Sequence, residues 1–352
     1  MLYAYSDIRI LQAEITSDCN ARCPQCPRNL YGGRVTPGLP ITRWRVSDLD
    51  RMFRSQFVEQ LTMLYLCGTY GDPMMHPQVL TIVQWFRDRN PHLRIGIHTN
   101  GGVGRIDTYR ALADSVDFIG FGIDGLADTN HIYRQGVRWD NLQARVSAYI
   151  EAGGHAIWDY IVFEHNQHQV EQARTLSHLQ GFKEFNVKRT ARFLNRQHQQ
   201  MPYQSVRNTH GAEVNRIYPP TRPEYQNSQA RPLSESEIRT TPILCNAQRI
   251  REVYVAATGQ VFPCGWLHDR LYGPEVTPTE DHCRMHQWLA GAGGDLGTNC
   301  IHTPLADIIE GEWFRTIATS HTTPSRLSRC AHMCGSTINP IGAQNQDIHY
   351  KD

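Results

Sequence analysis

Three cysteines lie close together near the start of the chain, in the segment Cys19-Asn20-Ala21-Arg22-Cys23-Pro24-Gln25-Cys26. Their C-x3-C-x2-C spacing allows three thiolates on one loop to converge on a single metal centre. A four-iron cluster takes four ligands, so three cysteines would leave one iron open to a substrate or a cofactor. A zinc knuckle with a remote fourth ligand is the alternative for this spacing.

The last third of the chain holds six of its ten cysteines. Four of them form two pairs with ligand-like spacing: Cys245 and Cys264, which flank a glycine turn at Gly259, then Cys330 and Cys334. Four thiols of this kind suit a zinc ion or an iron–sulfur cluster. Cys283 and Cys300 lie between the pairs, and either could replace one of the four ligands.

The elements that must position these cysteines alternate between strand-like and helix-like segments over about the first 200 residues. We expect strands at 9–16, 61–66, 94–98, 116–123, 156–163 and 185–193, and helices at 48–53, 78–88, 105–113, 141–152 and 169–180. Gly181 is a suitable end for the last helix. This alternation favours an α/β fold with a parallel sheet, either a partial barrel or an open doubly wound sheet. In both, functional side chains lie at the C-terminal ends of the strands.

Beyond residue 195 the alternation stops. Residues 196–240 are rich in Pro, Gln and Asn, which predicts an irregular linker or a substrate-contacting insertion. Residues 251–255 and 260–262 predict a hairpin around Thr258-Gly259, and 305–317 predict a helix. We therefore divide the chain into a core at 1–195, the insertion at 196–240, a second domain at 241–340 and a polar tail at 341–352.

The first cysteine segment and the strand ends resemble the radical S-adenosylmethionine (radical SAM) enzymes over residues ~9–195. In that family the same cysteine spacing follows the first strand of a partial (β/α)6 barrel, and the cysteines hold a 4Fe–4S cluster that binds SAM. Cys67-Gly68-Thr69-Tyr70-Gly71-Asp72-Pro73 is similar to the Gly-Gly-Glu-Pro segment that holds the SAM amino group. Tyr70 replaces the first Gly of that segment and Asp72 replaces its Glu.

Further strand ends carry the same resemblance. Thr99-Asn100-Gly101 is similar to the family's Thr-Asn-Gly, and Gly122-Ile123-Asp124-Gly125 to its Ser-Ile-Asp-Gly without the serine. Arg134 matches the arginine that pairs with the SAM carboxylate, a role that suits a guanidinium fork. The resemblance thus implies SAM contacts from the following residues: Tyr70, Gly71, Asp72, Pro73, Thr99, Asn100, Asp124 and Arg134.

The second cysteine set resembles the small α+β twitch or SPASM extension of many radical SAM enzymes. A SPASM domain holds two auxiliary 4Fe–4S clusters and uses a C-x2-C-x5-C run that this sequence lacks. The resemblance therefore implies one auxiliary cluster, as in a twitch domain, on Cys245, Cys264, Cys330 and Cys334. Cys67, beside the SAM segment, is either a small buried hydrophobic residue or a catalytic thiol.

The chemistry that the resemblance implies is reductive cleavage of SAM to methionine and a 5′-deoxyadenosyl radical, which abstracts a substrate hydrogen. One fully ligated auxiliary cluster favours an oxidoreductase that dehydrogenates a small polar metabolite, such as a sugar or aminocyclitol. The alternatives are crosslinking or epimerisation of a ribosomal peptide, or a non-catalytic iron–sulfur or zinc-binding protein. An electron donor such as flavodoxin or ferredoxin is the implied partner.

Composition limits the other partners. Lys+Arg total 35 and Asp+Glu 34, so no basic excess points to nucleic acid. No run reaches the roughly 20 apolar residues of a membrane span, and the first residues lack the features of a signal peptide. We therefore expect a cytoplasmic protein, in which clustered cysteines are more often ligands than disulfides.

The third, fifth and sixth expected strands carry six further polar residues that could face the site: His98, Asp159, Tyr160, Lys188, Arg189 and Arg192. Strand alternation directs about half of them to each face of the sheet. It does not tell which half faces the site, so the sequence assigns none of them a role.

Overall fold

The structure is a computed structural model that describes residues 2–194, 199–228, 230–273 and 278–337. The expected polar tail at 341–352 lies outside the described residues. Within them, one sheet of eight strands has the order β10-β9-β1-β2-β3-β4-β5-β6. All neighbouring strands are parallel except β10, which is antiparallel to β9. The expected α/β fold with a mostly parallel sheet is confirmed.

The six expected strands of the core all form. Five are shorter than the sequence pattern suggests, whereas the third extends one residue beyond its expected end. The six strands are β1 (Ile10–Ala13), β2 (Met63–Leu66), β3 (Arg94–Thr99), β4 (Phe118–Gly122), β5 (Ala156–Ile161) and β6 (Glu184–Lys188). Every residue of β2 and β4 is buried, as expected for strands that are covered on both faces. In β1 the alternation places Leu11 and Ala13 in the main core, while Gln12 lines the inner cavity.

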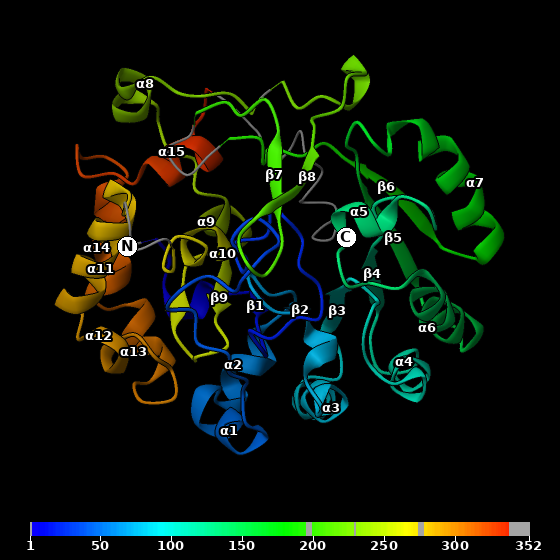
Figure 1. The fold of residues 1–352 in the computed structure, drawn as a ribbon. Helices are drawn as coiled ribbons and strands as arrows, with labels where there is room; N and C mark the ends of the chain where they lie inside the picture. Colours follow the sequence, from blue (N-terminus) through cyan, green and yellow to red (C-terminus); the bar gives the residue numbers. More distant parts are fainter. Residues whose placement is uncertain (1, 195–198, 229, 274–277, 338–352) are drawn as a thin grey trace.

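Helices connect these strands and cover the outside of the sheet. The core helices are α1 (Leu49–Met52), α2 (Ser55–Gln60), α3 (Val79–Arg89), α4 (Ile106–Leu112), α5 (Asn130–Tyr133), α6 (Trp139–Glu151) and α7 (Val170–Gln180). Helix α3 buries Val79, Ile82, Val83 and Phe86 on one face. Figure 1 shows the strands in an arc, with α3, α4, α6 and α7 along its outer side, which is the arrangement of a partial barrel.

The C-terminal hairpin joins the main sheet instead of forming a sheet of its own. It consists of β9 (Glu252–Val255) and β10 (Val261–Phe262), and β9 pairs in parallel with β1, with Leu11 opposite Val253. The sequence predicted the hairpin but not its place beside β1. The reason is that both faces of β9 are buried, which requires neighbours that lie some 240 residues away in the chain.

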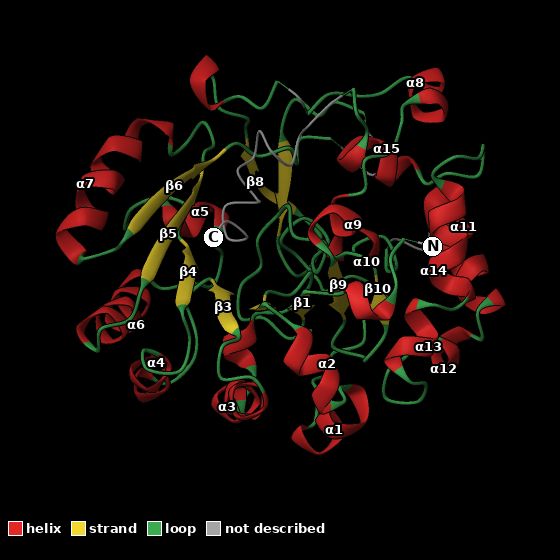
Figure 2. Ribbon diagram, turned by 180° about the vertical axis from the view of Figure 1, so that it is seen from behind, coloured by secondary structure: helices red, strands yellow, loops and turns green. Residues whose placement is uncertain are grey.

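The remaining helices lie beyond this hairpin, at the other end of the arc from α7 (Figure 2). They are α8 (Glu235–Thr240), α9 (Asn246–Ile250), α10 (Gly265–His268), α11 (Glu280–Gly291), α12 (Gly294–Gly297), α13 (Leu305–Ile309), α14 (Glu312–Ser320) and α15 (Ser328–Cys334). The expectation of a single helix at 305–317 is wrong, because this segment is divided into α13 and α14 at Gly311. Any side chain at Gly311 would overlap the carbonyl oxygen of Asp307.

The expectation of an irregular segment at 196–240 is wrong in part. Strands β7 (Gln204–Arg207) and β8 (Glu213–Ile217) form an antiparallel pair there, joined by a turn in which Gly211 has φ +89°. The pattern that predicts such a turn is Asn208 followed by Gly211, and the surrounding Pro and Gln residues obscured it. Among the described residues, the helices are all too short or too polar to cross a membrane.

Candidate functional site

Both cysteine sets line one cavity at the C-terminal ends of the strands. The cavity has a volume of about 820 Å³ and is bounded by Cys19, Cys23 and Cys26 and by Cys245, Cys264, Cys330 and Cys334. Pockets of roughly 300–1,000 Å³ are typical of small-molecule and cofactor sites. Folding thus gathers seven thiols, separated by up to 315 residues, around one space.

The first cysteine set lies on the loop after β1. Cys23 is 6% exposed, and Cys19 and Cys26 are half-buried. The Ala21 N–H donates to the Cys19 sulfur over 3.3 Å, and the Asn100 side-chain amide lies 3.6 Å from the same sulfur. Burial raises the pKa of all three thiols, that of Cys23 to about 11. Burial thus disfavours the thiolate forms, which metal coordination would favour.

Asp72 fastens the loop after β2 to the end of β3. Its carboxylate is 4% exposed and accepts from the Thr99 hydroxyl over 2.8 Å, from the Asn100 N–H over 2.8 Å and from the Asn100 side chain over 2.7 Å. The Met74 N–H donates to it as well. Burial raises the pKa of Asp72, and these hydrogen bonds oppose that rise. The carboxylate is thus occupied by the chain itself, and it holds Thr99 and Asn100 in place.

Arg134 carries a fixed positive charge beside the first cysteine set. Its Nε donates to the Asp124 carboxylate over 2.6 Å, and its Nη1 lies 3.9 Å from the Cys23 sulfur. Burial alone would lower the pKa of Arg134, but the Asp124 carboxylate raises it above its usual range. The side chain of Asp124 is fully buried and that of Arg134 is 14% exposed. Arg134 lines the cavity, whereas Asp124, which was also expected to contact SAM, is not among the residues that line it.

The other residues expected to contact SAM lie around the same space. Tyr70, Gly71, Asp72, Thr99 and Asn100 all line the cavity. Pro73 begins a short 3-10 helix behind it, with Asp72 as the N-cap. The strand-end residues are thus brought together as the parallel topology requires, because the C-terminal ends of neighbouring strands meet at one edge of the sheet.

The second cysteine set comes from three short helices. Cys245 precedes α9, Cys264 precedes α10, and Cys330 and Cys334 lie four residues apart on α15, on the same side of that helix. Burial raises the pKa of Cys245 to about 11, and the charges of the other thiols in the set contribute to the rise in Cys245, Cys264 and Cys330. The four thiols are thus close enough to act on one another.

The three other cysteines have different surroundings. Cys283 is exposed on α11, and Cys300 is 1% exposed, with its thiol donating to the Gly259 carbonyl. Neither lines the cavity. Cys67 does line it, and burial raises its pKa to about 12. Among these three residues, only Cys67 is placed to meet a substrate.

The thiol sets fit iron–sulfur clusters by their chemistry. Soft thiolate ligands select iron–sulfur clusters or zinc. Over the described part of the chain, no group of three or more His, Cys, Asp or Glu side chains is arranged to hold a single metal ion. Cys19, Cys23 and Cys26 offer three ligands with cationic and amide donors beside the sulfurs, and the second set offers four ligands.

Three polar side chains that the sequence left unassigned meet on the inner face of the sheet. The Asp159 carboxylate is bonded to the Lys188 ammonium at 2.8 Å and to Nε2 of His98 at 3.0 Å, and the side chain of Asp159 is 2% exposed. All three residues line the cavity, as does Arg192. Tyr160 points the other way and donates to the Asn166 carbonyl. Alternation predicted that Asp159 and Tyr160 face opposite sides, but only the packed sheet decides which side is inner.

Comparison with known proteins supports a family for the core. Residues 13–176 match the family profile described as the Radical SAM superfamily, which is the family that the first cysteine segment and the strand ends resemble. Over 130 residues the chain is 27% identical to the "Tungsten-containing aldehyde ferredoxin oxidoreductase cofactor-modifying protein" of Pyrococcus furiosus. That match covers 37% of this chain and 34% of the relative, so the chain matches about a third of the relative's length.

Solved structures of radical SAM enzymes share the fold. SuiB of Streptococcus suis bound to S-adenosylmethionine has a TM-score of 0.54 at 11% identity, covering 93% of this chain and 70% of SuiB. Another SuiB structure is matched over 65% of its length. The anSMEcpe structure with bound AdoMet has a TM-score of 0.54 at 12% identity, covering 90% of this chain and 81% of that one. At such identities the likeness shows the fold alone.

Proposed function

We propose that this chain, whose residues 13–176 carry the radical SAM domain, cleaves SAM reductively and oxidises a small polar metabolite. The observation that carries the proposal is the single cavity shared by the first cysteine set, the strand-end motifs, the His98–Asp159–Lys188 group and the second cysteine set. A SAM-bound 4Fe–4S cluster would supply the electron that splits SAM into methionine and a 5′-deoxyadenosyl radical. The radical then takes a hydrogen atom from the substrate.

The residues of this chain would bind and orient the reactants. Cys19, Cys23 and Cys26 would hold the cluster, and the guanidinium of Arg134 would pair with the SAM carboxylate. Asn100 and Thr99 would shape the pocket, since Asp72 fixes both of them.

The proposed oxidation also needs acceptors for an electron and a proton. After hydrogen abstraction, the substrate radical loses one electron and one proton to become the oxidised product. The electron would go to an auxiliary 4Fe–4S cluster held by Cys245, Cys264, Cys330 and Cys334. The proton would go to the His98–Asp159 pair, which is hydrogen-bonded and lines the same cavity. We further propose that a reduced flavodoxin or ferredoxin supplies the initiating electron.

The experiment is anaerobic reconstitution followed by reduction with dithionite in the presence of SAM. Wild-type protein should form 5′-deoxyadenosine, measured by liquid chromatography and mass spectrometry, even without substrate. The Cys19→Ala/Cys23→Ala/Cys26→Ala variant should form none. Cys283→Ala is the matched control, because this thiol is exposed and lies away from the cavity, and it should retain full activity. Reconstituted wild type that forms no 5′-deoxyadenosine under any reductant would contradict the proposal.

Peptide modification is the second candidate, and the fold neighbours favour it. One SuiB structure is "bound to precursor peptide SuiA" and one anSMEcpe structure has bound "Cp18Cys peptide", with TM-scores of 0.53 and 0.52. Gln204, the first residue of β7, lines the cavity, and a peptide can add to the edge of a strand pair such as β7 and β8. In an epimerisation Cys67 would be the hydrogen donor, whereas oxidation needs no donor.

Product mass separates the two candidates. Wild type and Cys23→Ala would each be incubated with SAM, reductant and small-molecule or peptide extracts in deuterated water. Oxidation predicts a small product that lacks two hydrogens and carries no solvent deuterium. A peptide product of unchanged formula that gains one deuterium, and that disappears in Cys67→Ala, would establish epimerisation instead.

A further inference from the structure

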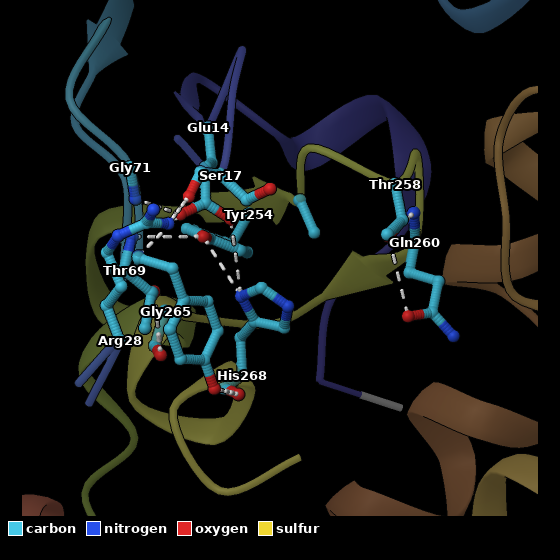
Figure 3. A network of polar contacts seen from close by, with 12 residues as sticks. Glu14, Ser17, Arg28, Thr69, Gly71, Tyr254, Thr258, Gln260, Gly265 and His268 are labelled. Atoms are coloured by element: carbon cyan, nitrogen blue, oxygen red, sulfur yellow. Dashed lines mark hydrogen bonds and ion pairs between the residues drawn. The ribbon is translucent and has the colours of Figure 1, made fainter. Parts of the chain in front are cut away.

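A buried polar cluster joins the C-terminal extension, by which we mean the described residues from β9 onward, to the loop that is expected to hold SAM. The cluster consists of Glu14 at the end of β1, Tyr254 on β9 and His268 on α10 (Figure 3). Glu14 is 1% exposed, Tyr254 is fully buried and His268 is 2% exposed. We call these three residues the Glu14 cluster, and the segment that they contact is the loop 68–72.

The Glu14 carboxylate holds the backbone of this loop directly. Its Oε1 accepts from the Tyr70 N–H over 2.6 Å and from the Gly71 N–H over 3.0 Å. A side chain at Gly71 would overlap the carbonyl oxygen of Thr16, and a Cβ at Gly68 would lie 2.7 Å from Oε1 of Glu14. The loop can therefore approach β1 this closely only because both positions are glycine.

Residues of the C-terminal extension hold the other side of the loop. The Tyr254 hydroxyl accepts from the Thr69 N–H over 3.3 Å and lies 3.1 Å from Nδ1 of His268. The Tyr70 hydroxyl donates to the His268 carbonyl over 2.8 Å. The Thr69 hydroxyl donates to the carbonyl of Gly265, the residue after Cys264. Each residue from Thr69 to Gly71 is thus hydrogen-bonded to a residue of the Glu14 cluster, and Thr69 is also bonded to Gly265 at the start of α10.

The cluster is costly to bury, so its presence calls for a role. Burial raises the pKa of Glu14 and lowers that of His268 to about 3, so the imidazole is neutral at pH 7 and provides no countercharge. Nε2 of His268 has no hydrogen-bond partner among the described residues. Buried polar groups are retained in proteins when they specify a geometry, and here the geometry specified is that of the loop.

We infer that Glu14, Tyr254 and His268 are positioning residues that fix the loop 68–72 for SAM, so that residues 252–268 are a working part of the SAM site. The inference rests on the proposed function. It differs from that proposal in assigning SAM binding to a part of the chain outside the matched domain at 13–176.

The test uses full-length protein with reconstituted clusters and measures the dissociation constant of SAM by equilibrium dialysis. Glu14→Ala removes the acceptor of two N–H groups and should weaken SAM binding by at least about tenfold. Glu14→Gln keeps a carbonyl oxygen at that place and should bind within about threefold of wild type. Tyr254→Phe removes the acceptor of the Thr69 N–H and the contact with His268, and it should weaken binding about 3- to 10-fold.

Tyr160→Phe is the matched control, since it removes a buried hydroxyl that bonds to Asn166 and not to the loop. It should bind SAM within about twofold of wild type. Iron content measured in every variant shows that the clusters are retained. Wild-type affinity in both Glu14→Ala and Tyr254→Phe would overturn the inference.

Hydrogen exchange provides a second measurement that does not depend on SAM. The amides of Tyr70 and Gly71 should exchange faster in Glu14→Ala than in wild type or Glu14→Gln, and the amide of Thr69 should exchange faster in Tyr254→Phe. Unchanged exchange at these amides would overturn the positioning role, even if SAM binding fell. If wild type itself bound no SAM, the proposed function would fail, and the exchange result alone would decide whether the cluster positions the loop.

Discussion

At the scale of single residues, the site depends on charges that are paired within the chain before any ligand binds. Arg134 is bonded to Asp124, and Asp72 is bonded to Thr99 and Asn100. Such second partners hold a side chain in one orientation and so prepare it for a ligand. The consequence is that mutation of a residue in the site removes both a ligand contact and an internal contact.

The Arg134–Asp124 pair allows these two effects to be separated. Arg134→Ala leaves a fully buried carboxylate unpaired, so we expect the free energy of unfolding to fall by about 3–5 kcal/mol. SAM binding should weaken by about 10- to 100-fold because a charge-assisted contact is lost.

The control is Arg134→Ala/Asp124→Asn, in which the buried group is neutral and can still accept from the Ile161 N–H. This double variant should recover most of the stability in urea unfolding while SAM binding stays weak. Recovery of both properties would show that Arg134 acts only through folding.

At the scale of elements, the sequence marked the C-terminal end of one helix correctly. Helix α7 ends at Gly181 with φ +89°, in the left-handed region, as the sequence predicted. Glycine adopts this conformation without the steric cost that a Cβ brings. The helix covers the outer face of the sheet, far from the cavity, so its end affects stability and not chemistry.

Two glycines, one with positive φ and one without, test whether backbone conformation explains the glycine at a helix end. Gly181→Ala should lower the free energy of unfolding by about 1 kcal/mol, because the backbone there has positive φ. Gly291→Ala, at the exposed end of α11 with no atom near its Cβ, should leave stability unchanged or raise it by about 0.5 kcal/mol. Both variants should form 5′-deoxyadenosine at the wild-type rate. Equal destabilisation in chemical unfolding would contradict the conformational explanation.

At the scale of the whole molecule, the notable feature is that the C-terminal extension completes the core sheet. Strand β9 pairs with β1, and short helices before and after β9 bring the second cysteine set to the same cavity as the first. Because β1 precedes the first cysteine loop, one strand pair connects both sets. This arrangement is consistent with the proposed electron transfer between groups held by the two cysteine sets.

Iron analysis tests whether both thiol sets hold clusters. Anaerobically reconstituted wild type should contain about eight irons per chain, four for each cluster. The Cys19→Ala/Cys23→Ala/Cys26→Ala variant and the Cys245→Ala/Cys264→Ala/Cys330→Ala/Cys334→Ala variant should each contain about four.

Cys283→Ala and Cys300→Ala are the controls, since neither thiol lines the cavity, and both should keep about eight irons. The second multiple variant should still form 5′-deoxyadenosine but no oxidised product. Zinc without iron in both sites of wild type would contradict the cluster assignment. Loss of iron in Cys300→Ala would show that Cys300 is a ligand in place of one of the four assigned cysteines.

Local patterns in the sequence determined much of this protein. The C-x3-C-x2-C spacing predicted the radical SAM domain, and hydrophobic periodicity predicted the six core strands and most core helices. These features are readable because each depends on neighbours within a few residues of one another. The order of strand-end motifs also predicted which residues would surround one space, since parallel strands end at the same edge.

Only the tertiary structure decided the contacts between distant parts of the chain. It placed β9 beside β1, turned Asp159 and Lys188 inward to meet His98, and brought Tyr254 and His268 to the loop 68–72. In the sequence, Glu14 is merely one polar position of an alternating strand. Its role follows from what packs against it, because burial and hydrogen-bond partners are properties of the folded chain and not of local pattern.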